Sequence, residues 1–124
     1  MERTIFEQVG GWPFFERLVD GFYRGVEADP LLRAMYPEDL TESREHLVLF
    51  LAQYWGGPRD YEERRGHPRL RRRHEPFPIT RAARDAWLAA MTNSLDALRA
   101  EIGEDRYREM LDYFTMSAKQ LRNV

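Results

Sequence analysis

Residues 66–77, GHPRLRRRHEPF, place four arginines directly before or near His74, with a proline on either side of it. A neutral histidine ring can bind a metal ion, and the planar guanidinium group of arginine binds carboxylates and phosphates. The segment therefore allows two interpretations. Either the arginines form a basic surface and His74 has no role in binding, or His74 binds a group whose charged parts the arginines also contact.

The spacing around His74 indicates which way this side chain faces. On a short helix expected over 68–75, Leu70 and His74 stand four residues apart and share one side. Arg71 and Arg72 point elsewhere, so His74 is expected on the inward face of a basic helix. Taken alone, such a histidine is more often a buried side chain bonded to a carbonyl than a ligand. An arginine run, taken alone, is more often a solvated face.

Three aromatic residues with polar atoms favour the ligand interpretation. Tyr23 follows Phe22 at the edge of one apolar helix stripe, Tyr36 ends a short turn, and Trp87 lies in the middle of a long stripe. Each combines a large apolar ring with one polar group that needs a hydrogen-bond partner when buried. Singly, each is more typical of a core. Together with an inward histidine, they predict a pocket that binds something polar beside a metal.

The elements that must position these residues are predicted to be helices almost throughout. Glycines, prolines and capping residues mark the ends of the helices, and residues 58–67, which lack an apolar period, predict a loop. No strand is predicted. The expected helices are a short one from Thr4 to Gly10-Gly11, one from Pro13 to Asp29, a single turn through Met35-Tyr36, one from Asp39 or Thr41 to Gly56, the short helix 68–75, a long one from Thr80 to Ile102 and a last one over 107–121.

The composition limits the classes of protein to which the chain can belong. Its 124 residues predict one all-α domain, residues 1–124, and a net charge of −2 argues against general nucleic-acid binding. With no cysteine, disulfides, iron–sulfur clusters and thiolate catalysis are excluded. No apolar run approaches the roughly 20 residues of a membrane span. We therefore expect a soluble, cytoplasmic protein.

Five segments together resemble a known family. They are VGGWPFFERLVDGFY, LLRAMYPEDL, FLAQYWGGP, GHPRLRRRHEPF and RDAWLAAM. With YWGGP followed by RGHPRLRxRH, the chain resembles the truncated haemoglobins of bacteria, specifically group II (the O-type), over essentially its whole length. The resemblance implies a two-on-two helical sandwich around haem b, in which a loop replaces most of the helix that carries the proximal histidine.

The same resemblance implies a role for individual residues. His74 matches the proximal histidine that binds the haem iron, and Tyr23, Tyr36 and Trp87 match the distal residues that face a bound gas. Ser43 stands where larger globins have a distal histidine. Leu47 is expected beside Ser43 over the distal side.

Further contacts with haem are expected around these positions. Arg73, next to His74, is the first candidate to pair with a haem propionate. His46 and His67 are expected on the surface. Apolar contact with the porphyrin is expected from Phe50, Leu70, Phe77, Met91 and Leu95.

Three functions remain open at this point. The first is reversible binding, storage or transport of dioxygen and other diatomic gases (O2, CO, NO), for which a polar distal pocket implies slow release. The second is redox chemistry on haem, namely nitric oxide dioxygenation or peroxide reduction, which would require a reductase. The third is a haem-free helical module that docks an anionic partner through residues 59–73. The sequence also leaves a homodimer open.

Overall fold

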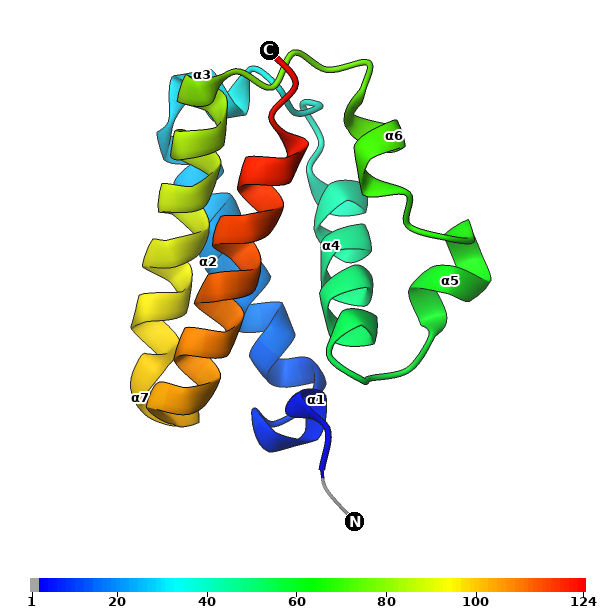
Figure 1. Ribbon diagram of the computed structural model, residues 1–124, viewed down its shortest axis with the longest axis vertical. Coiled ribbons are helices and arrows are strands. Elements are labelled where there is room, and N and C mark those ends of the chain that lie inside the picture. The colour runs from blue at the N-terminus through cyan, green and yellow to red at the C-terminus, as the bar shows by residue number, and fades with distance from the viewer. Residues whose placement is uncertain (1–2) are drawn as a thin grey trace.

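The computed structural model describes residues 3–124, apart from the side chain of Arg71, and within that range every regular element is a helix (Figure 1). This confirms the all-α prediction. None of the helices in this part of the chain is both long and apolar enough to cross a bilayer. The helices are α1 (Ile5–Gln8), α2 (Trp12–Ala28), α3 (Pro30–Arg33), α4 (Thr41–Tyr54), α5 (Asp60–Arg65), α6 (Leu70–His74) and α7 (Arg81–Leu121).

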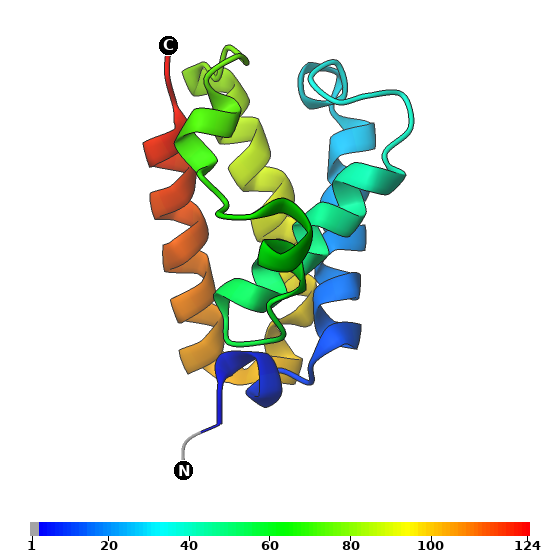
Figure 2. The same ribbon diagram turned by 90° about the vertical axis from the view of Figure 1, so that its right-hand side faces the viewer.

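The longest element, α7, consists of two antiparallel arms joined by a sharp bend. Gly103 has φ of 82° and ψ of 165°, a left-handed backbone conformation that a side chain would disfavour. Arg99 forms two 2.7 Å hydrogen bonds to Glu104 across the bend. The arms, coloured yellow-green and orange-red, lie side by side in both views (Figures 1 and 2). The bend therefore separates the two helices that the sequence predicts after Thr80.

Two pairs of helices form the body of the molecule. α2 packs against both α4 and α7, so α2 and α4 face the two arms of α7 as a two-on-two sandwich (Figure 2). The core between them is mostly aromatic and aliphatic, which agrees with the apolar stripes of the sequence. Its largest fully buried side chains are Phe14, Phe15, Phe22, Phe114, Leu18, Leu32, Leu51, Met91, Leu95 and Met110.

Several predicted helix ends are confirmed and others change. The hydroxyl of Thr4 accepts a hydrogen bond from the backbone amide of Glu7. The side-chain carboxylate of Glu7 accepts one from the backbone amide of Thr4, which completes the predicted capping box. Thr80 caps α7 through the Ala83 amide. α4 begins at Thr41, and the carboxylate of Asp39, one of the two predicted caps, accepts a hydrogen bond from the Thr41 amide at 3.0 Å.

The shorter helices differ more from the expectation. The single turn expected through Met35-Tyr36 ends earlier, at Arg33, and the helix expected over 68–75 spans only Leu70–His74. The prediction of a loop over residues 58–67 is wrong, because α5 occupies Asp60–Arg65. Tyr61 is the only buried side chain of α5, so the segment lacks the repeated apolar positions from which a helix is predicted.

The crossing of α2 and α7 depends on a small residue, and substituting it tests the packing. A methyl group at Gly25 would lie 2.8 Å from the Cβ atom of Ala90 and 3.3 Å from its Cα atom. We expect Gly25→Ala to lower the free energy of unfolding by about 1–2 kcal/mol, since overpacking outweighs the gain in helix propensity. Chemical denaturation measures this change. Ala90→Gly should restore stability selectively in the Gly25→Ala background, and additive effects of the two changes would contradict the proposed contact.

Candidate functional site

A cavity of about 670 Å³ lies between α4, α6 and both arms of α7. This volume is in the range of small-molecule and cofactor sites, roughly 300–1,000 Å³. Most of its lining is aromatic or aliphatic, with a few polar groups among them. The lining residues are Tyr23, Met35, Tyr36, Pro37, Ser43, His46, Leu47, Phe50, Leu51, Tyr61, Arg65, Leu70, Arg73, His74, Phe77, Trp87, Tyr113, Phe114, Ser117 and Leu121.

His74 contributes a ring nitrogen to one wall of this cavity. Its Nδ1 lies 2.6 Å from the carbonyl oxygen of Leu70, one helical turn earlier. A carbonyl can only accept, so Nδ1 carries the proton and Nε2 is the nitrogen available to a metal. Within residues 3–124, no three His, Cys, Asp or Glu side chains are grouped so that they could hold a metal ion.

The three aromatic donors converge on the same cavity from different elements. Tyr23 comes from α2, Tyr36 from the segment after α3, and Trp87 from the first arm of α7. The ring centroids of Tyr23 and Tyr36 are 5.6 Å apart in an edge-to-face arrangement. Phe22 packs beside Trp87 at 5.5 Å. The structure thus brings together the donors that are separate in the sequence.

Burial raises the pKa of both tyrosine hydroxyls further above neutral pH, where they are already protonated. It raises the pKa of Tyr36 to about 12, although a hydrogen bond with the side chain of Trp87 partly offsets the effect. Burial, and secondarily the nearby Tyr36, also raises the pKa of Tyr23, and a hydrogen bond with Ser43 lowers it in part. At neutral pH this end of the cavity therefore presents uncharged hydroxyl and indole groups that can donate hydrogen bonds.

The apolar residues expected in the site line the cavity with two exceptions. Leu47 and Phe50 do so from α4, alongside Ser43. Leu70 and Phe77 do so from α6 and the segment after it.

Met91 and Leu95 are the exceptions. Both side chains are fully buried in the core and absent from the cavity wall. They follow Trp87 at intervals of four residues, so they continue its stripe along the arm, away from the cavity. The second arm of α7 lines the cavity instead, through Tyr113, Phe114, Ser117 and Leu121. The apolar stripe predicted over 107–121 indicates which face of this arm is buried, but not whether that face meets the core or a cavity.

Arg73 lies at the cavity edge and is partly engaged with the backbone. Its Nε donates to the carbonyl of Pro68 at 2.7 Å, and its Nη2 donates to the carbonyl of Arg65 at 2.9 Å. Its guanidinium carbon lies 5.9 Å from the centre of the Tyr61 ring. A guanidinium group has five N–H donors, so these bonds leave capacity for an anion.

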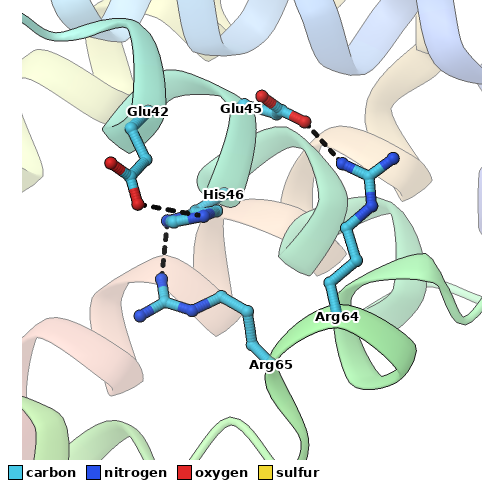
Figure 3. Close-up of polar contacts among 5 residues, drawn as sticks. All are labelled: Glu42, Glu45, His46, Arg64 and Arg65. Carbon is cyan, nitrogen blue, oxygen red and sulfur yellow. Dashed lines mark hydrogen bonds and ion pairs between the residues drawn. The ribbon is translucent and has the colours of Figure 1, made fainter.

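His46 keeps a side chain that is 28% exposed, and it also lines the cavity. Its Nδ1 lies 2.6 Å from a guanidinium nitrogen of Arg65, and Glu42 approaches the ring from the other side (Figure 3). A neighbouring pair, Glu45 with Arg64, joins the same two helices. These contacts attach α5 to α4. His67, by contrast, is exposed, as predicted.

Comparisons with known proteins agree on one family. The sequence profile of the family described as Bacterial-like globin matches residues 4–120. The relative named Group 2 truncated hemoglobin YjbI, from Bacillus subtilis, is 48% identical over 96 residues, which cover 76% of this chain and 73% of the relative.

Solved structures extend this similarity to the fold. A hemoglobin from the thermophilic phototrophic bacterium Chloroflexus aurantiacus has a TM-score of 0.95 and 51% identity, covering 99% of this chain and all of the other. A truncated oxygen-avid haemoglobin from Bacillus subtilis has a TM-score of 0.90 and 37% identity, covering 98% of this chain and 100% of the other.

The contact between His46 and Arg65 can be tested by titration. Burial, and after it the positive charge of Arg65, lowers the pKa of His46 below its usual value. Arg65→Gln removes the charge but not the burial, so we expect the pKa of His46 to rise, as followed by NMR of its imidazole protons. Arg64→Gln, whose guanidinium pairs with Glu45, should change it less. Equal titration of His46 in all three proteins would contradict the contact.

Proposed function

Because the chain belongs to the bacterial-like globins, and within them to the group II truncated haemoglobins, we propose that it holds haem b in the central cavity and binds dioxygen there reversibly. One observation carries the proposal. A histidine with a free ring nitrogen lines the same largely apolar cavity as three uncharged hydrogen-bond donors.

The residues around the cavity suit haem b chemically. Aromatic and aliphatic side chains such as Phe50, Leu70 and Phe77 supply an apolar surface for a porphyrin. When bound, haem supplies an iron atom that takes one axial histidine and leaves the opposite position open to a diatomic gas. His74 is the residue we assign to the axial position. Its Nδ1 bond to the Leu70 carbonyl orients the ring and makes Nε2 a better electron donor.

Cations at the cavity edge would hold the two propionate carboxylates of haem. Arg73 remains our first candidate, since its guanidinium retains donors beyond those that bind the Pro68 and Arg65 carbonyls. Arg65 and His46 line the same cavity and add positive charge or further donors nearby. The arginine-rich region thus serves the cofactor in this proposal.

Tyr23, Tyr36 and Trp87 would donate hydrogen bonds to a polar gas held on the distal side. Two or three such bonds, at about 1 kcal/mol each, would slow release roughly 10- to 100-fold or more. A carrier needs prompt release, so slow release favours tight binding or storage. A structural relative is described as oxygen-avid, which agrees with this expectation. Nitric oxide dioxygenation or peroxide reduction would use the same donors.

The alternative of a docking module for an anionic partner receives less support. Two cations of residues 59–73 have acidic partners within the molecule, since Arg59 pairs with Glu62 and Arg64 pairs with Glu45. Two others, Arg65 and Arg73, line the cavity, where haem carboxylates would lie.

Replacing His74 tests the cofactor and its ligand. The purified protein should show the Soret absorbance band of haem, and the spectrum should change with dioxygen and carbon monoxide. His74→Ala removes the axial nitrogen, so this variant should lose haem or show an altered, weakly ligated spectrum. His67→Ala, at an exposed position, should leave the spectrum unchanged. Identical ferrous and ferric spectra for His74→Ala and the wild type would rule out His74 as the ligand.

Replacing Trp87 tests the distal donors. Trp87→Phe keeps most of the ring packing and deletes the indole N–H, so the loss of about 1–2 kcal/mol should speed dioxygen release about 5- to 30-fold. Carbon monoxide is less polar when bound, so its release should respond more weakly. Stopped-flow dissociation of both gases provides the measurement.

The role assigned to Trp87 also predicts coupling with its neighbour. Tyr23→Phe can free Tyr36 or Trp87 to move toward the gas, so the double variant with Trp87→Phe should be non-additive. If Trp87→Phe alters neither release rate, or alters both equally, the hydrogen-bonded distal pocket is the wrong description.

A further inference from the structure

One side chain near the end of α7 ties down the segment that follows His74. The Nδ2 group of Asn123 donates to the carbonyl oxygens of Phe77, at 2.9 Å, and His74, at 3.3 Å. Its Oδ1 accepts a hydrogen bond from the Ile79 amide at 2.9 Å. The backbone amide of Asn123 also donates to the Ile79 carbonyl at 3.1 Å. Both ends of the Asn123 amide group are therefore engaged with residues 74–79.

The helix that carries His74 needs such external support. α6 has only five residues, and a helix of that length is not stable by itself. The last carbonyls of any helix also lack partners within the helix. At its start, α6 is fastened by Arg73, which bonds the carbonyls of Pro68 and Arg65. At its end, the corresponding side-chain bonds come from Asn123.

The two hydrogen bonds of His74 act on different parts of the structure. The bond from Nδ1 to the Leu70 carbonyl fixes the ring relative to α6, because both groups belong to that helix. It does not fix α6 relative to the cavity. The bond from Asn123 to the His74 carbonyl links α6 to the second arm of α7, whose Phe114 and Ser117 line the cavity. Asn123 thereby connects the ligand to the wall that it faces.

We propose that Asn123 is a positioning residue for His74, and that it holds the backbone of His74 in the place from which Nε2 would bind haem iron. This role rests on the proposed function, since it presupposes that His74 is the axial ligand. Asn123 touches neither haem nor gas in this proposal. It acts through the backbone of residues 74–79, and nothing in the apolar pattern of the chain marks it.

Three variants separate this role from a simple tie between two chain segments. Asn123→Ala removes every side-chain bond to residues 74–79. Asn123→Asp keeps an oxygen that can accept from the Ile79 amide but loses the donor to the Phe77 and His74 carbonyls. Arg122→Ala is the matched control, because the side chain of Arg122 donates to the nearby carbonyl of Val124 at 3.0 Å and not, within residues 3–124, to residues 74–79. All are studied as purified proteins loaded with haem.

Two measurements on these variants report the tie and its effect separately. Hydrogen exchange of the Ile79 amide reports whether that amide is bonded to the Asn123 side chain. The exchange rate should rise about five- to tenfold in Asn123→Ala and stay near the wild-type rate in Asn123→Asp. The resonance Raman band of the iron–histidine bond in the ferrous, gas-free protein reports the position of His74. That band should shift or broaden in both Asn123 variants and stay unchanged in Arg122→Ala.

The outcomes distinguish failure of this inference from failure of the proposed function. Faster exchange of Ile79 with an unchanged iron–histidine band would mean that Asn123 only stabilises the fold, which overturns the positioning role. Unchanged exchange in Asn123→Ala would show that the tie does not form. A wild-type protein that takes up haem without any iron–histidine band would overturn the axial assignment of His74, and with it the proposed function.

Discussion

The whole site depends on keeping one imidazole directed at the cavity from a helix of only five residues. A ring on so short a helix has little support from its own element, so its orientation must come from hydrogen bonds to the backbone. The His74–Leu70 bond turns the ring and selects its protonated nitrogen. Arg73 and Asn123 then hold the two ends of α6. The helices around the cavity can form a binding site only because these contacts fix the position of His74 relative to them.

The fold could be predicted, and the residues of the candidate site could be selected, because each leaves a local mark on the sequence. Amphipathic stripes with a 3.6-residue period identify the long helices, and capping residues such as Thr4 and Thr80 identify where they begin. Tyr23, Tyr36 and Trp87 stand out because a polar atom on a large ring needs a partner in an apolar environment. Inward spacing and the surrounding motif together single out His74.

The features that sequence reasoning missed depend on contacts between distant segments. α5 has a single buried residue, Tyr61. The packing of Tyr61 on Phe50 and a few polar contacts attach α5 to α4, so an apolar period does not reveal the helix. His46 meets Arg65 only when α4 and α5 lie together. An apolar stripe, such as the one that contains Met91, shows which face of a helix is buried, but not whether core or cavity lies opposite. Asn123 makes its contacts 44 to 49 residues away along the chain.

The bend at Gly103 also bears on how the chain can assemble. Bringing two segments together costs chain entropy that grows with the length of the loop between them. The two arms of α7 meet beside the bend itself, where Arg99 pairs with Glu104, so this antiparallel pairing closes almost no loop. α2 meets α7 only by closing a loop of more than fifty residues between Ala28 and Arg81. The arm that carries Trp87 and the arm that carries Phe114 can thus pair at a lower cost in chain entropy than α2 needs to pack on them.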